Sequence, residues 1–111
     1  MSSNKKRINK IAKIEIRRIF KGLQLKGFKK EKRYIFSKFK KIYPAFHQHP
    51  KYRNPKLLIP IIIYFYLRIL DHRINKLELI EIAGISSVDF NSLPQRLKEY
   101  IERKNNKRGL E

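Results

Sequence analysis

The feature that most constrains this chain is an uncharged segment at its centre. Residues 57–67, LLIPIIIYFYL, are bounded by Lys56 and Arg68 and contain no charged side chain. A transmembrane helix needs about 20 apolar residues, so this segment is too short to span a bilayer and we expect no membrane partner. It predicts instead a helix over residues 55–70 that is buried on most sides at the centre of a small domain.

Pro60 lies inside this predicted helix. A proline in a helix interior removes one backbone hydrogen bond and crowds the carbonyl four residues earlier, here that of Lys56. We therefore expect either a kink at residues 56–60 or a helix that begins near Ile59. Asn54 followed by Pro55 favours the earlier start, with asparagine as N-cap and proline at the first helical position.

The 111-residue chain has a formal net charge of +19, and most of that charge lies in its first half. Residues 1–56 hold 19 basic and 2 acidic residues, whereas residues 57–111 hold 9 and 7. The two acids of the basic half, Glu15 and Glu31, are expected to pair with neighbouring cations on a helix face. Such a positive field attracts polyanions, which makes nucleic acid the expected partner, duplex DNA first and RNA as the alternative.

Two amphipathic helices with basic outer faces are predicted in this half, over residues 5–24 and 29–43. Gly22 and Gly27 bracket the end of the first of them. A connector punctuated by prolines, residues 44–54, separates the second from the central helix.

Shorter helices follow the central one. The first is predicted over residues 76–83 and ends at Gly84 in a left-handed conformation. Another begins at Ser87, and Pro94 divides it from a last helix over residues 95–103. Side chains suited to N-cap positions precede the first two, Asn75 and Ser86.

We expect one domain over residues 1–103 and a frayed tail over residues 104–111. No targeting segment is visible, which predicts an intracellular protein, cytoplasmic or nucleoid-associated. No Gly-rich phosphate loop, nucleophile elbow or His–carboxylate arrangement appears, so we do not expect an enzyme. The chain has no cysteine, and His47 and His49 lack the further ligands that zinc requires, so we expect no metal and no cofactor.

Residues 76–93, KLELIEIAGISSVDFNSL, follow the plan of a helix-turn-helix with its turn at Gly84 and Ile85. The long apolar helix before them opens with Arg-x-Pro-Lys and closes with Tyr-x-x-Leu-Arg. This combination, residues 53–93, resembles the cyclin-like repeat of the general transcription factor TFIIB and its archaeal relative TFB.

The resemblance implies an all-α, five-helix cyclin-like bundle with a central, buried third helix and a C-terminal helix-turn-helix-like hairpin. It also implies a DNA-binding protein of transcription. The chain departs from the family in having room for one repeat, no zinc ribbon before it, and large apolar residues where the family has alanine. In the segment that aligns with the family's recognition helix, Asp89 opposes phosphate and Pro94 shortens the helix, so we expect mainly electrostatic contacts to the nucleic-acid backbone.

The predicted nucleic-acid-binding residues lie on the basic helices, the connector and the segment aligned with the recognition helix. They are Lys10, Lys13, Arg17, Arg18, Lys29, Lys30, Lys32, Arg33, Lys40, Lys41, Lys51, Arg53, Lys56, Ser87 and Asn91. Two tyrosines among basic residues, Tyr34 and Tyr52, are candidates either for stacking on unpaired bases or for ordinary packing. Phe36, Phe39 and Tyr43 fit the buried stripe of the second basic helix.

A protein-interaction adaptor of a transcription or cell-cycle type complex is the alternative class of function. Cyclin-like folds often bind protein partners, and the acidic side chains of Asp89, Glu99 and Glu102 suit a protein surface better than a phosphate one. The salt dependence of nucleic-acid affinity separates this alternative from DNA or RNA binding.

Overall fold

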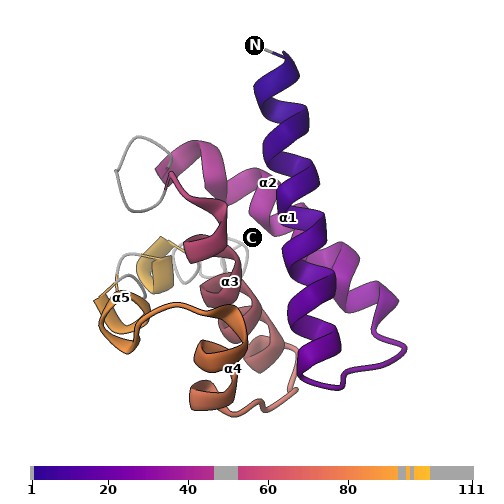
Figure 1. The fold of residues 1–111 in the computed structure, drawn as a ribbon, viewed down its shortest axis with the longest axis vertical. Coiled ribbons are helices and arrows are strands. Elements are labelled where there is room, and N and C mark those ends of the chain that lie inside the picture. Colours follow the sequence, from indigo (N-terminus) through magenta and orange to yellow (C-terminus); the bar gives the residue numbers. More distant parts are fainter. Residues whose placement is uncertain (1, 47–52, 93–94, 96, 101–111) are drawn as a thin grey trace, which may run out of the picture.

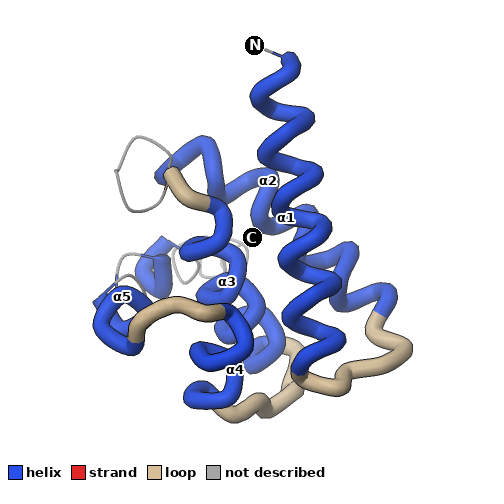
Figure 2. The backbone as a smooth tube through the Cα atoms, in the orientation of Figure 1, coloured by secondary structure: helices blue, strands red, loops and turns tan. Residues whose placement is uncertain are grey.

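The computed structural model describes residues 2–46, 53–92, 95 and 97–100, and these residues are helical or lie in short connections (Figures 1 and 2). The predicted all-α class is confirmed for this part of the chain, while the cyclin-like arrangement stays a prediction. The proposed tail, residues 104–111, lies outside it. The helices are α1 (Ser2–Gly22), α2 (Lys29–Phe46), α3 (Pro55–Ile69), α4 (Lys76–Ala83) and α5 (Ser87–Ser92).

Helix α3 is the centre of the fold. It contacts α1, α2, α4 and α5, and Figure 1 shows it between α1 on one side and α5 on the other. Because neighbours cover most of its circumference, an apolar stripe would not suffice and nearly every position must be apolar. This confirms that the uncharged segment forms the core. The buried residues of α3 are Pro55, Leu58, Ile59, Pro60, Ile61, Ile62, Ile63, Tyr66 and Leu67.

The start of α3 lies at Asn54 and Pro55, and Pro60 is inside the helix. The backbone amide of Lys56 donates to Asn54 Oδ1 at 3.0 Å, which confirms the predicted N-cap. The alternative start near Ile59 is therefore wrong. Pro60 has no amide hydrogen to donate, so α3 lacks one backbone hydrogen bond there. Burial of the proline ring in the core offsets part of this loss of free energy.

Helix α2 continues through Pro44 to Phe46, so its predicted end at residue 43 is wrong. The last turn carries a tertiary contact that the local sequence does not reveal. The ring of Phe46 packs edge-on against Tyr100, with centroids 5.4 Å apart. Packing of this kind stabilises a final helical turn that a proline alone would weaken.

The predicted caps of α4 and α5 are confirmed. The amide of Glu78 donates to Asn75 Oδ1 at 3.1 Å, and the amide of Asp89 donates to Ser86 Oγ at 3.0 Å. Gly84 ends α4 with φ of 73°, the left-handed conformation that glycine adopts without steric cost.

Two residues after the last residue of α1 and of α3 lies a left-handed residue that is not glycine, Gln24 with φ of 59° and Asp71 with φ of 65°. After α1, the amide of Leu25 donates to the Phe20 carbonyl at 2.9 Å, which closes the turn as in a Schellman motif. The bonds after α3 follow the same pattern. The end of α1 therefore lies between Gly22 and Gly27 as predicted, but the left-handed residue that closes the turn is Gln24.

Gly22 has a packing role instead, at the contact between α1 and α4. A Cβ atom built on Gly22 would lie 2.7 Å from Ile82 Cγ2, well inside van der Waals contact. Glycine at this position allows α4 to approach the last turn of α1.

We expect Gly22→Ala to destabilise the domain by about 1–3 kcal/mol, because the new methyl overpacks this contact. Alanine would otherwise be favoured over glycine in a helix by roughly 1 kcal/mol. Ile82 cannot easily yield, since its β-branched side chain is restricted at χ1. Urea denaturation measures the change. In an Ile82→Ala background the same substitution should cost much less, and equal costs in the two backgrounds would contradict the contact.

Candidate nucleic-acid interface

A hollow between α1 and α2 is lined mostly by basic side chains. Its volume is about 350 Å³. In the part of the chain that the structure describes, no Asp or Glu is among its lining residues. We call this surface the basic groove, and it is lined by Lys13, Ile16, Arg17, Lys29, Lys32, Arg33 and Phe36.

The helical repeat places these side chains together. Lys13 and Arg17 are about one turn apart on α1, and the α2 residues recur at intervals of three or four, so each set occupies one helix face. Ile16, which is buried, provides apolar surface between the two rows of cations. Packing of α1 against α2 then brings the two basic rows to the same groove.

Phe36 was expected in the buried stripe, but its ring is only half-buried and lies beside two lysines. The Nζ atoms of Lys13 and Lys40 lie 5.1 and 4.8 Å from the ring centroid, within cation–π range. The ring therefore positions one cation from α1 and one from α2.

The structure brings only some of the predicted binding residues together. Those in the basic groove are Lys13, Arg17, Lys29, Lys32 and Arg33. Lys40 and Arg53 line a second hollow, and Lys51 lies outside the described residues. Four more of the predicted cations are exposed but line neither hollow: Lys10, Lys30, Lys41 and Lys56.

Ser87 and Asn91 do not belong to the basic groove. Both are exposed on α5, and Figure 1 shows α5 on the opposite side of α3 from α1. A single short segment of nucleic-acid backbone therefore cannot contact the groove and the predicted recognition residues together.

Arg18 is engaged within the fold. Its Nη2 lies 2.7 Å from Glu15 Oε2, and its Nη1 donates to the Ile82 carbonyl at 2.7 Å. The hydrogen bond to Glu15 raises the pKa of Arg18, so the guanidinium stays charged. The predicted pairing of Glu15 with a neighbouring cation is confirmed. Arg18 lies at the α1–α4 contact, and its role in nucleic-acid binding stays a prediction.

We expect Arg18→Ala to lower the free energy of unfolding by about 1–3 kcal/mol, because it leaves a carboxylate and a helix-end carbonyl without their donor. Glu15 is only 6% exposed, so water replaces the lost partner poorly. Thermal denaturation measures the loss. Arg17→Ala is the matched control, since it truncates an exposed groove arginine and should change stability by roughly 0.5 kcal/mol or less. Equal melting temperatures for the two variants would show that the pair contributes nothing.

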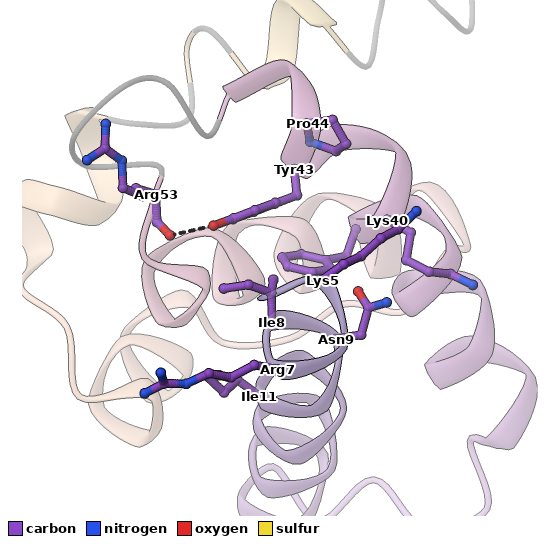
Figure 3. A pocket seen from close by; sticks show the side chains of 10 residues that line it. Lys5, Arg7, Ile8, Asn9, Ile11, Lys40, Tyr43, Pro44 and Arg53 are labelled. Atoms are coloured by element: carbon purple, nitrogen blue, oxygen red, sulfur yellow. Dashed lines mark hydrogen bonds between the residues drawn. The ribbon is translucent and has the colours of Figure 1, made fainter. Parts of the chain in front are cut away.

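A second hollow lies further along the same two helices, between the first half of α1 and the last turns of α2 (Figure 3). We call it the aromatic pocket; its volume is about 650 Å³. The Tyr43 hydroxyl donates to the Arg53 carbonyl at 2.9 Å. Burial raises the pKa of Tyr43, while the positive charge of Arg53 lowers it by a smaller amount. The phenol therefore stays protonated and able to donate. The pocket is lined by Lys5, Arg7, Ile8, Asn9, Ile11, Phe39, Lys40, Tyr43, Pro44 and Arg53.

Tyr34 follows one of its two expectations, ordinary packing, whereas Tyr43 differs from its expectation. Tyr34, a candidate for base stacking, packs edge-on against Tyr66 with centroids 5.5 Å apart and has Lys38 Nζ 5.3 Å from its ring. Tyr52 lies outside the described residues. Tyr43, which the pattern assigned to the buried stripe, is half-buried and lines the pocket instead.

Comparisons with other proteins do not extend these observations. The chain matches no protein-family model, and neither a curated protein nor a solved structure matches it significantly. The geometry of the two hollows therefore carries the functional argument.

Other kinds of site have little support in the part of the chain that the structure describes. None of its helices combines the length and the apolar character that a bilayer crossing requires. It contains no group of three His, Asp or Glu side chains arranged to hold a metal ion. His72 packs edge-on against Phe28 with centroids 5.1 Å apart, and His47 and His49 fall outside the described residues.

Proposed function

We propose that this protein binds nucleic acid through phosphate contacts in the basic groove, in a transcription-related role. The observation that carries the proposal is the convergence of five cations from α1 and α2 on one groove. Gathering so many like charges costs self-repulsion, which a bound polyanion relieves. Contacts of this kind position a nucleic acid without reading its sequence.

The resemblance to a cyclin-like repeat supports the assignment to transcription. In its favour are the order of the helices, the burial of the third, and the Gly84 turn between α4 and α5. Helix α5 covers only Ser87–Ser92 and includes Asp89 in its first turn. We therefore assign α5 a positioning role and not base recognition.

A titration of duplex DNA and of single-stranded RNA by fluorescence anisotropy at several salt concentrations tests the proposal. If all five groove cations contact phosphates, the logarithm of the association constant should fall against log salt with a slope of about −4.5 for duplex DNA and about −3.5 for a single strand. Oligonucleotides of unrelated sequence should bind alike. If the association constants of duplex DNA and of single-stranded RNA both stayed independent of salt, phosphate binding by the groove would be refuted.

The second candidate is a protein-interaction adaptor, and one observation favours it. Leu77 on α4 and Val88 on α5 are 71% and 74% exposed, and both lie away from the basic half of the chain. Weak nucleic-acid binding without salt dependence would favour this candidate over the first.

A further inference from the structure

The aromatic pocket combines an apolar floor with a cationic rim. Its apolar side chains come from α1 and α2, with Ile8 and Tyr43 facing each other across it (Figure 3). Lys5 and Lys40 lie on one side of Tyr43, and Arg7 and Arg53 lie on the other. No carboxylate is among its lining residues in the described part of the chain. A ligand that complements this surface has a flat apolar part and negative charge beside it.

The pocket and the basic groove lie along the same contact between α1 and α2. On α1 the pocket is lined from Lys5 to Ile11 and the groove from Lys13 to Arg17. Their centres are about 10 Å apart along the helix, from a rise of about 1.5 Å per residue. Phe36 connects them, because its ring lies beside both Lys13 of the groove and Lys40 of the pocket.

We infer that the aromatic pocket binds an unpaired nucleobase of the strand whose phosphates lie in the basic groove. This inference rests on the proposed function and specifies its ligand as a single strand or a nucleic acid with an unpaired nucleotide. At about 3.4 Å per stacked nucleotide, a separation of about 10 Å spans roughly three nucleotides. Phosphates on either side of the bound base lie within reach of the rim cations.

An unpaired base fits this pocket better than the other parts of a nucleic acid. A phosphate gains little from an apolar floor, since it would lose its hydration there. A base in a duplex is stacked and paired, and extracting it costs a few kcal/mol, so an unpaired base enters at lower cost. The Asn9 carboxamide at the pocket edge can both donate and accept hydrogen bonds to the edge of a base.

The test compares two ligands of equal charge on the full chain. One is a ten-nucleotide oligothymidylate, and the other is the corresponding abasic strand, in which tetrahydrofuran replaces every nucleoside. We expect the oligothymidylate to bind about 5- to 100-fold more tightly, the effect of stacking one base. Tyr43→Ala should abolish this difference, because it removes the ring on which the base stacks. Tyr43→Phe keeps the ring and should keep the difference.

The outcomes separate the two proposals. Equal affinity for both strands with a normal salt slope overturns the base pocket and leaves phosphate binding by the groove intact. A difference that persists in Tyr43→Ala also overturns it, because the base must then bind elsewhere. Failure of both strands to bind overturns the inference, and the proposed function falls with it only if duplex DNA also fails to bind or binds without salt dependence. Even if Tyr43→Ala does not fold, equal binding of the two strands by the unaltered protein overturns the base pocket.

Discussion

Replacing Ile62 with aspartate should unfold the domain. Ile62 is completely buried in α3, the helix that contacts all the other helices described above. A carboxylate at this position would lie among isoleucine side chains without a partner, at a cost of several kcal/mol. Small domains have only about 5–15 kcal/mol of stability in total. The variant should therefore lose most of its helical circular dichroism signal at 25 °C or melt far below the wild type.

The control for this substitution introduces the same side chain at an exposed site. Val88 is 74% exposed on α5, and Val88→Asp should leave the melting temperature nearly unchanged. Ile62→Ala adds a graded test, with an expected loss of about 2–5 kcal/mol from the cavity and the lost apolar contacts. A folded, monomeric Ile62→Asp protein with wild-type melting would show that α3 is not the core.

Neutralising the basic groove should nearly abolish nucleic-acid binding at physiological salt. The variant replaces Lys13, Arg17, Lys32 and Arg33 with glutamine and leaves Arg18 in its structural pair. Four lost phosphate contacts should reduce the magnitude of the salt slope on duplex DNA by about 3.6. At 0.1 M salt this corresponds to a loss of affinity of roughly a thousand-fold or more, because each phosphate contact contributes about 0.9 units to the logarithm of the association constant at that salt concentration.

The matched control removes the same number of charges from exposed positions outside both hollows. It replaces Lys21, Lys26, Arg73 and Lys98 with glutamine. Its effect on affinity should be smaller, since none of these four side chains lines either hollow. If the two variants lose affinity equally, binding follows the net charge of the protein and not the groove.

The helical class, the core and most helix ends could be predicted from the sequence because they depend on local interactions. An uncharged segment bounded by Lys56 and Arg68 has no stable place except the interior, whatever its neighbours are. The caps at Asn54, Asn75 and Ser86 depend on hydrogen bonds to an amide two or three residues away, which sequence spacing reveals directly. The basic faces of α1 and α2 likewise follow from helical periodicity.

What only the tertiary structure decided is which side chains of different helices meet. The approach of α4 to α1 gives the Arg18 guanidinium, which already pairs with Glu15 within α1, a second partner in the Ile82 carbonyl, and it gives Gly22 a packing role. The packing of α1 on α2 selects five of the predicted cations for one groove. It leaves Phe36 half-buried in that groove and Tyr43 half-buried in the aromatic pocket, instead of in the core. Helical periodicity specifies the face on which a side chain lies. It does not specify how far a neighbouring helix covers that face, because this depends on contacts between residues distant in the sequence.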